Sequence, residues 1–211
     1  MNAFGAFLRP LPLIAVLRGI TPDEIPDVAG ILFDAGFRIL EVPLNSPRAF
    51  ASIALLAQRH GHDCLVGAGT VVDPADVARV RDAGGRLIVM PHADPAVVRA
   101  AKAAGMVCAP GVATPTEAFA AIAAGADGLK MFPAEALPPA ALKAWRAVLP
   151  KEIPVFAVGG IRPETMAGYW SAGAAGFGTG SNLYRPGAVP ADVRAAAAAF
   201  AAAVRALPLR P

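Results

Sequence analysis

A lysine inside an apolar stretch is the residue of this sequence with the clearest chemical potential. Lys130 lies in Gly-Leu-Lys-Met-Phe-Pro at residues 128–133, whereas Lys102, Lys143 and Lys151 fall on predicted helices or helix ends. If this segment is a strand, Lys130 points to the side opposite to its two neighbours. Burial disfavours the charged ammonium, and an uncharged lysine amine can form a Schiff base with a carbonyl substrate. The alternative is a structural lysine paired with a carboxylate.

Glu41 is the matching carboxylate. It is the charged residue of the segment Ile-Leu-Glu-Val-Pro at 39–43, and strand alternation places it opposite to its two apolar neighbours. A carboxylate close to a reacting lysine can act as general acid and base. The alternative is a buried ion pair with Lys130 or Arg18, and the two interpretations are compatible.

Eight prolines mark the elements that must position these two residues. Each follows a cap-like or loop residue and suits the first position of a helix, where a backbone N–H is not needed. Thr21 with Glu24, and Thr114 with Glu117, also have the spacing of a capping box. The eight predicted helix starts are Pro22, Pro47, Pro74, Pro95, Pro115, Pro139, Pro163 and Pro190.

Short apolar runs separate these helices, as strands buried on both faces of a parallel sheet do. Strand and helix alternate eight times, which predicts an α/β fold of the (β/α)8 TIM-barrel type. We expect one domain over residues 1–211, with 1–10 as an N-terminal extension and 190–206 as a closing helix. The alternative, an open doubly wound sheet, lacks its G-x-G-x-x-G turn after the first strand. The predicted strands are residues 13–17, 38–42, 64–68, 86–90, 106–109, 128–132, 154–158 and 175–178.

Polar residues follow the predicted strands at their carboxyl ends, where barrel active sites lie. Arg18, after the first strand, could hold a carboxylate or phosphate through two parallel hydrogen bonds. Thr70 ends the run Gly-Ala-Gly-Thr at 67–70, whose glycines either leave room for a substrate or allow tight packing. Asn45 and His92 lie at the same end, and the sequence assigns no role to them.

Glycines follow the last two strands, where TIM barrels often hold a phosphate group. Gly159 and Gly160 come after the seventh strand, and Gly-Thr-Gly-Ser at 178–181 ends the eighth. Glycine lets backbone N–H groups approach an anion closely. Together with Ser181, these glycines predict a phosphate site.

Composition argues against several other classes of function. The net charge is +3, and 15 of the 19 basic residues are arginines dispersed singly, so nucleic acid is not an expected partner. No stretch approaches the roughly 18 apolar residues of a membrane span, and the first residues do not have the pattern of a secretory signal. Cys64 and Cys108 both lie in apolar runs, which indicates free buried thiols and a reducing, cytoplasmic location.

His60 and His62 have the spacing of metal ligands, but they lie between a helix end and a strand start. This is the end of the barrel opposite to the expected site, and the helix dipole explains a histidine at a helix C-terminus. The sequence has no other arrangement typical of a catalytic metal site, so we expect metal-free chemistry.

These segments resemble, in order and spacing, the KDPG/KHG aldolase family over about residues 10–187. The resemblance implies a class I aldolase that acts on 2-keto-3-deoxy-6-phospho sugar acids. The segments around Arg18 and Asn45 are similar to those of members that cleave 2-dehydro-3-deoxy-6-phosphogalactonate. The segments that carry the resemblance are residues 11–24, 40–47, 67–70, 129–133, 156–160 and 180–185.

The resemblance also implies the roles of the candidate site residues. Lys130 would form the Schiff base and Glu41 would move protons, so that pyruvate and glyceraldehyde 3-phosphate form without a cofactor. A homotrimer is implied as well. The substrate-binding residues would be Arg18 and Thr70 at the carboxylate end and hydroxyls, and Gly159, Gly160 and Ser181 at the phosphate.

Alternative functions share parts of this pattern. The same chemistry could act on 2-dehydro-3-deoxy-6-phosphogluconate or 4-hydroxy-2-oxoglutarate, and Pro-Ala-Glu-Ala at 133–136 is similar to the gluconate type. A non-covalent phosphate-binding isomerase would keep the glycine loops but would not need Lys130. A barrel that only binds a sugar phosphate or a partner would not need Glu41 either.

Overall fold

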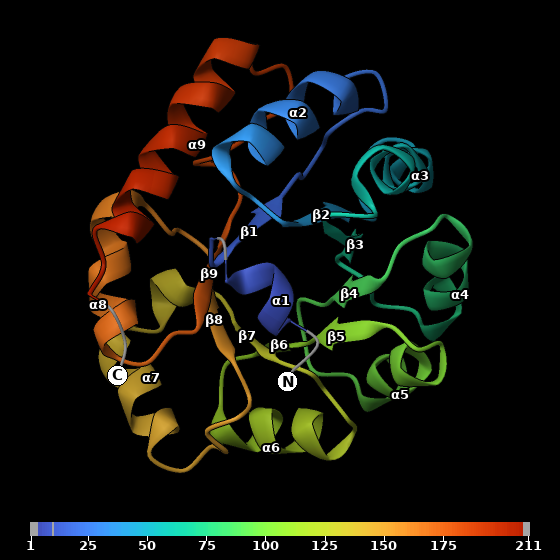
Figure 1. The fold of residues 1–211 in the computed structure, drawn as a ribbon. Coiled ribbons are helices and arrows are strands. Elements are labelled where there is room, and N and C mark those ends of the chain that lie inside the picture. The colour runs from blue at the N-terminus through green and yellow to red at the C-terminus, as the bar shows by residue number, and fades with distance from the viewer. Residues whose placement is uncertain (1–3, 10, 209–211) are drawn as a thin grey trace.

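Parallel strands form a ring at the centre of the molecule, and helices cover its outside (Figure 1). The computed structural model describes residues 4–9 and 11–208. Each pair of neighbouring strands is parallel, in the order β5-β4-β3-β2-β1-β9-β8-β7-β6, which confirms the predicted barrel. The strands are β1 (Leu13–Val16), β2 (Ile39–Pro43), β3 (Leu65–Gly69), β4 (Leu87–Val89), β5 (Val107–Ala109), β6 (Gly111–Val112), β7 (Leu129–Met131), β8 (Val155–Val158) and β9 (Gly176–Thr179).

Helices connect successive strands around the ring. Glycine ends several of them, as Gly36 does after the second helix with a φ of 105°, in the left-handed conformation that glycine adopts readily. The last helix lies beside the second in Figure 1. The helices are α1 (Gly5–Leu8), α2 (Ile25–Ala35), α3 (Ala49–His60), α4 (Pro74–Asp82), α5 (Pro95–Ala103), α6 (Pro115–Ala123), α7 (Pro139–Arg146), α8 (Met166–Ser171) and α9 (Pro190–Arg205), with short 3-10 helices at Ala134–Ala136 and Pro163–Thr165.

The ring closes at the fifth predicted strand, residues 106–109, which the structure shows as β5 and follows with a short strand, β6, that the sequence does not predict. Pro110 stands between them. Proline has no N–H for the ladder, so hydrogen bonding is interrupted at this residue. β5 pairs with β4, while β6 pairs with β7. The Pro110 carbonyl still accepts a 2.9 Å hydrogen bond from the Lys130 backbone N–H, so the division does not open the barrel.

Two apolar regions follow from the alternation of side chains along the strands. The larger region lies between the barrel and its helices and includes Leu40, Leu129 and Met131. The smaller one fills the inside of the barrel and includes Ile39 and Phe156. Residues next to each other in a strand therefore belong to different regions, as strand geometry requires.

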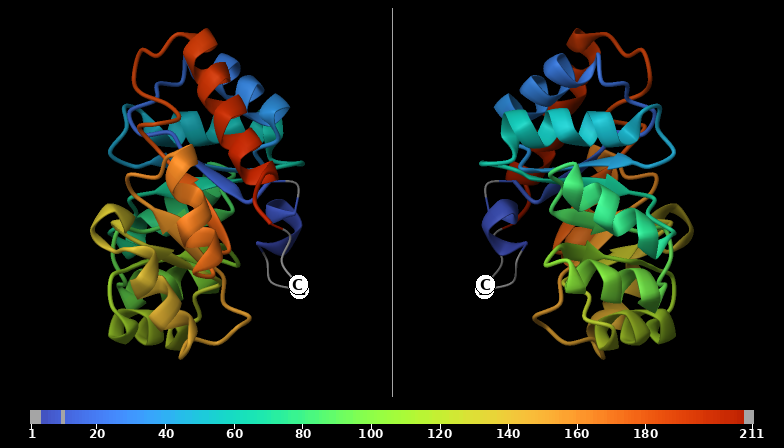
Figure 2. Two further views of the ribbon diagram at one scale, coloured as in Figure 1. Left: turned by 90° about the vertical axis from the view of Figure 1, so that its left-hand side faces the viewer. Right: turned by 90° about the vertical axis from the view of Figure 1, so that its right-hand side faces the viewer.

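The N-terminal segment covers one end of the barrel. The sequence describes it only as an extension over residues 1–10, of which 1–3 and 10 lie outside the described residues. α1 lies across the centre of the ring in Figure 1 and at one end of it in Figure 2. Phe4 is fully buried, and its ring centroid lies 5.0 Å from that of Phe156 inside the barrel. The segment thus seals the end opposite to the carboxyl ends of the strands.

Most of the predicted helix starts are confirmed. Five of the eight prolines are the first residue of an α-helix, namely Pro74, Pro95, Pro115, Pro139 and Pro190. The capping box of Thr114 and Glu117 is also confirmed. Pro163 begins a 3-10 helix that leads into α8.

Two helix starts are wrong. α2 begins at Ile25, not at Pro22, and α3 begins at Ala49, not at Pro47. Only half of the capping box of Thr21 and Glu24 forms: the Glu24 carboxylate accepts from the Thr21 backbone N–H. The Thr21 hydroxyl also donates to this carboxylate, and the Glu24 N–H bonds to the Thr21 carbonyl instead of the hydroxyl. Glu24 itself precedes α2, and its other oxygen accepts from Tyr184.

Cys64 and Cys108 are buried free thiols, as the sequence predicts. Burial raises the pKa of Cys64 to about 11 and that of Cys108 to about 12. Both thiols therefore stay protonated at neutral pH. Over residues 4–9 and 11–208, none of the helices combines the length and the apolar character needed to cross a membrane.

Candidate active site

Lys130 projects from β7 into the barrel. Its neighbours Leu129 and Met131 pack against the helices, so the predicted direction of the lysine is confirmed. Its side chain is 5% exposed, and its Nζ lies 4.6 Å from the ring centroid of Phe132. Desolvation lowers the pKa of the ammonium, and the negative charge of Glu41 only partly offsets this effect. The amine is therefore easier to deprotonate than an exposed lysine, as a nucleophile must be.

Glu41 projects from β2 into the same space and is 1% exposed. Within the described part of the chain, its Oε2 atom has no hydrogen-bond partner. Burial raises the pKa of Glu41 to about 7, against the opposing effects of the Lys130 and Arg18 charges. A carboxyl group with this pKa can both give and take a proton at neutral pH.

Glu41 and Lys130 line one small cavity of about 10 Å³ inside the barrel. This is close to the space that one water molecule needs, and the two charged groups supply polar partners for it. Among residues 4–9 and 11–208, no ion pair within 4.0 Å joins the lysine to the glutamate. The pair is thus a facing acid and amine rather than a closed salt bridge.

The two glycines of the 67–70 run are required for different steric reasons. A Cβ at Gly67 would overlap the backbone of Leu87 on the neighbouring strand, which is tight barrel packing. A Cβ at Gly69 would instead overlap the Glu41 carboxylate. Gly69 therefore makes room for the Glu41 carboxylate, a choice that the sequence leaves open.

Arg18 is held by two other residues at the carboxyl ends of the strands. Its Nη1 donates to Asn45 Oδ1 at 2.7 Å, and its Nη2 donates to Thr70 Oγ1 at 3.3 Å. Thr70 has a φ of 54°, which is unusual for a β-branched residue and typical of strain retained at functional sites. The structure thus joins Arg18 to Thr70, another residue predicted at the site, and to Asn45; the sequence predicts neither contact.

A larger cavity of about 470 Å³ opens above Lys130 at the carboxyl ends of the strands. Gly159 and Gly160 have φ values of 106° and 64°, so two successive glycines are in the left-handed region. Successive backbone N–H groups in such turns can face an anion. The predicted residues that line this cavity are Arg18, Lys130, Gly159, Gly160 and Ser181. Thr70 reaches it only through Arg18, and Glu41 lies below it in the smaller cavity.

Other residues that line this cavity are absent from the predicted site. Phe132 shares the face of Lys130, so alternation along the strand would have indicated it. Glu135 stands in a 3-10 helix and carries no pattern that points to the site, yet its carboxylate lies against Gly160. Tyr184 and Arg185 come from the long connection after β9, whose course the sequence does not define.

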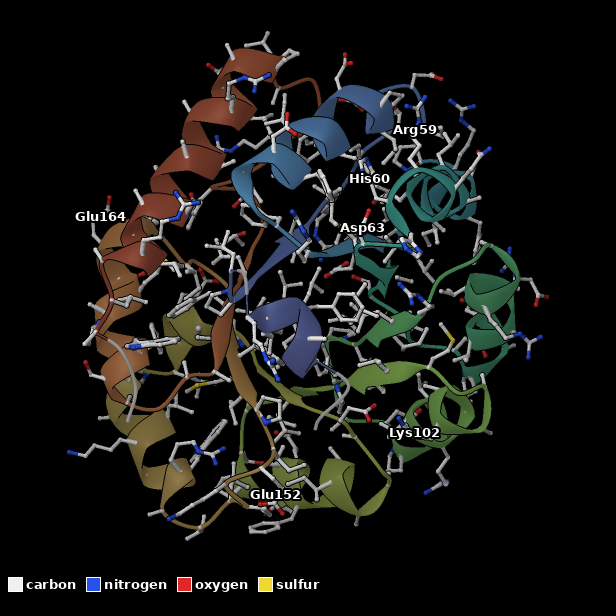
Figure 3. The ribbon with its side chains drawn as sticks, viewed as in Figure 1. Arg59, His60, Asp63, Lys102, Glu152 and Glu164 are labelled. Atoms are coloured by element: carbon white, nitrogen blue, oxygen red, sulfur yellow. The ribbon has the colours of Figure 1, made fainter. Side chains whose placement is uncertain are left out.

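No histidine lines this cavity among the residues that the structure describes. His92 is exposed after β4. His60 ends α3 and stacks on Phe33 with 5.1 Å between ring centroids. Figure 3 shows it between Arg59 and Asp63, on the side of the molecule where α1 lies. Within the described residues, no group of three or more His, Cys, Asp or Glu side chains could hold a metal ion.

Comparison with known proteins agrees with this geometry. The profile of the family KDPG and KHG aldolase matches residues 5–197. The chain is 51% identical over 192 residues to the probable 2-dehydro-3-deoxy-6-phosphogalactonate aldolase of Rhizobium meliloti (strain 1021), covering 91% of each chain. It is 49% identical over 195 residues to the 2-dehydro-3-deoxy-6-phosphogalactonate aldolase of Escherichia coli (strain K12), covering 92% of this chain and 95% of the relative.

A solved structure described as native KDPGal has the same fold. It superposes with a TM-score of 0.91 at 49% sequence identity, and the match covers 92% of this chain and 95% of that one. The alignment thus extends over nearly all of the barrel and its site. This chain belongs to the KDPG and KHG aldolase family.

Proposed function

We propose that this protein is a class I aldolase that cleaves 2-dehydro-3-deoxy-6-phosphogalactonate into pyruvate and D-glyceraldehyde 3-phosphate. The observation that carries the proposal is the buried amine of Lys130, which faces the carboxyl group of Glu41 inside the barrel. The names of the curated relatives at 51% and 49% identity support the choice of substrate.

Lys130 supplies the electron sink of the reaction. Its uncharged Nζ adds to the C2 carbonyl to form a carbinolamine, and loss of water leaves an iminium. The C3–C4 bond then breaks. Its electron pair moves toward the iminium nitrogen and forms an enamine, while the C4 hydroxyl loses its proton and becomes the aldehyde of glyceraldehyde 3-phosphate. Protonation of the enamine at C3 and addition of water to the iminium release pyruvate and restore the amine.

Glu41 moves the protons of these steps. Protonated, it supplies the proton with which the carbinolamine hydroxyl leaves as water. Ionised, it accepts the proton of the C4 hydroxyl when the carbon–carbon bond breaks. The pKa of about 7 makes both states accessible at neutral pH. The small cavity that it shares with Lys130 has room for a water molecule that could carry the proton between them.

The two ends of the substrate bind on either side of this pair. Arg18, held by Thr70, binds the carboxylate at C1, because a guanidinium can donate two parallel hydrogen bonds to a carboxylate. Gly159, Gly160 and Ser181 bind the 6-phosphate with backbone N–H groups and a hydroxyl. Binding of the distant phosphate helps to hold the reacting carbon at the lysine.

Trapping with pyruvate tests the proposal. Incubation with pyruvate and borohydride should give a stable adduct, and peptide mapping should place it on Lys130. Lys130→Ala should form no adduct and lose turnover. Lys143→Ala, at an exposed lysine of α7, is the matched control and should behave as the wild type. Normal turnover by Lys130→Ala would overturn the mechanism.

Parallel assays of the two epimeric phospho sugar acids test the substrate. The galactonate epimer should have the higher kcat/KM. A higher value for the gluconate epimer would instead agree with the Pro-Ala-Glu-Ala segment at 133–136 and would overturn the substrate assignment.

We also propose that the protein is a homotrimer in the cytoplasm. The family resemblance supports the trimer, and the free thiols of Cys64 and Cys108 fit a reducing compartment. Light scattering coupled to gel filtration should give about three times the 21.4 kDa mass of one chain. A monomer mass at micromolar concentration would contradict the assembly without affecting the chemistry.

A further inference from the structure

The carboxylate of Glu24 joins two loops that are far apart in the sequence. Its Oε2 accepts two hydrogen bonds from Thr21, one from the Thr21 backbone N–H at 2.9 Å and one from the Thr21 hydroxyl at 2.7 Å. Its Oε1 accepts from the Tyr184 hydroxyl at 2.8 Å and from the Gly187 N–H at 3.2 Å. The latter two partners are 160 and 163 residues away along the chain. Glu24 thus connects the loop after β1 to the loop after β9.

These two loops follow neighbouring strands and form adjacent walls of the larger cavity. Arg18 and Gly19 line it from the first loop, and Ser181 and Pro186 line it from the second. The loops pack closely, because a Cβ at Gly19 would come within 2.5 Å of Pro186 Cγ. Tyr184 is only 2% exposed, so its hydroxyl needs a partner inside the protein. Glu24 is that partner.

Glu117 shows that capping alone does not require such a bridge. It stands in the first turn of α6, and its carboxylate accepts from the N–H groups of Ala113 and Thr114 and from the Thr114 hydroxyl. All of these partners belong to its own turn. Glu24 uses one oxygen in the same local way and directs the other to the far loop.

Glu24 is ionised in this arrangement. Burial alone would raise its pKa, but the hydrogen bonds from Thr21, Tyr184 and Gly187 lower it below the usual value. Hydrogen bonds to a charged acceptor are stronger than those between neutral groups. The bridge therefore consists of charge-assisted hydrogen bonds to both loops.

We propose that Glu24 is a positioning residue for the phosphate end of the substrate. By holding the loop of Ser181 against the loop of Arg18, it sets the distance between the phosphate site and the carboxylate site. The inference rests on the proposed function for the identity of the two ligand groups. It adds a residue that touches neither the reacting carbons nor the lysine.

The test separates phosphate binding from chemistry at Lys130. Glu24→Gln keeps the size of the side chain but removes its charge and one acceptor. Its Kd for D-glyceraldehyde 3-phosphate, measured by calorimetry, should rise about tenfold, as expected for a loss of about 1.4 kcal/mol. Adduct formation with pyruvate and borohydride, which uses no phosphate, should proceed at the wild-type rate. Glu117→Gln is the matched control and should change neither quantity.

Tyr184→Phe is the second variant, for use if Glu24→Gln does not fold. It removes only the 2.8 Å hydrogen bond from the Tyr184 hydroxyl to Glu24. It should weaken phosphate binding in the same direction. An unchanged Kd in the folded variant, or equal losses in phosphate affinity and adduct formation, would overturn the positioning role. A wild type that forms no pyruvate adduct would refute the aldolase mechanism, whereas the phosphate Kd values would still decide the role of Glu24.

Discussion

The carboxylate of Glu41 and the ammonium of Lys130 face one cavity inside the barrel without forming a direct ion pair in the described structure. β2 and β7 place them there from non-adjacent strands. Burial shifts the two pKa values toward one another, upward for the acid and downward for the amine. A direct salt bridge would hold both groups in their charged forms. Because the two groups are separated, burial can raise the pKa of the acid to about 7 and lower that of the amine below its usual value.

Glu41→Gln should lower kcat by about 10² to 10⁴, the usual contribution of general acid–base catalysis. The glutamine has nearly the same volume, so the circular dichroism spectrum should not change. Steady-state kinetics with the phosphogalactonate substrate measure the effect. An unchanged kcat would assign Glu41 to structure alone.

The same variant should alter the pH dependence of stability. The pKa of Glu41 is raised from 4.5 in the unfolded chain to about 7 in the folded protein, so the folded state holds the proton more tightly. The stability linked to this proton is present below the unfolded value and is lost as pH rises through the folded value. Between about pH 5 and about pH 8, Glu41→Gln should therefore gain stability relative to the wild type, by at most about 3 kcal/mol.

Urea unfolding at the two pH values measures this difference. If the free energies of unfolding of the wild type and of Glu41→Gln change in parallel between about pH 5 and about pH 8, the prediction is wrong. That outcome would mean that Glu41 has an ordinary pKa in the folded protein.

Gly69→Ala should disturb catalysis because the added Cβ would overlap the Glu41 carboxylate. Displacement of a catalytic group by about 1 Å costs about 100-fold in rate. Gly30→Ala is the matched control, since apart from its chain neighbours and the backbone of α2 no described atom lies within 4 Å of the added Cβ. The control should keep full activity and gain about 0.5–1 kcal/mol of stability. Full activity of Gly69→Ala would show that Glu41 can move aside without loss.

Asn45→Ala should weaken binding of the substrate carboxylate, because Arg18 loses the 2.7 Å bond that orients it. KM for pyruvate in the condensation direction should rise several-fold, with a smaller change in kcat. Ser46→Ala is the control on the same loop, since Ser46 accepts from the Gly19 N–H and does not touch Arg18. Equal effects of the two substitutions would point to the loop rather than to the guanidinium.

Gly160→Ala should weaken phosphate binding. Its φ is 64°, and the added Cβ would come within 2.6 Å of a Glu135 carboxylate oxygen. Gly105→Ala is the matched control. Gly105 has a similar φ of 70°, and apart from its chain neighbours no described atom lies within 4 Å of the new Cβ. Both substitutions should cost about 1–2 kcal/mol of stability through the backbone. Only Gly160→Ala should raise the KM for D-glyceraldehyde 3-phosphate, and a matching rise in Gly105→Ala would argue against a local phosphate site.

Local patterns account for what could be predicted of the fold. Every strand except β6 and most helix starts follow from a few consecutive residues, because alternation and the N-terminal preference for proline act within one element. The directions of Lys130 and Glu41 follow from the same alternation and are confirmed by the structure. The exceptions, at Pro22 and Pro47, lie in loops that line or support the site, where contacts with other loops override the local preference.

Sequence alone predicted the alternation of strands and helices, the lysine and the glutamate that face inward, and the end of the barrel where an active site is expected. Only the tertiary structure decided that Asn45 and Thr70 hold Arg18, that Gly69 makes room for Glu41, and that Glu24 reaches Tyr184. The physical reason is that these contacts join segments from separate βα units. Their distances depend on how the ring closes, which no single segment encodes.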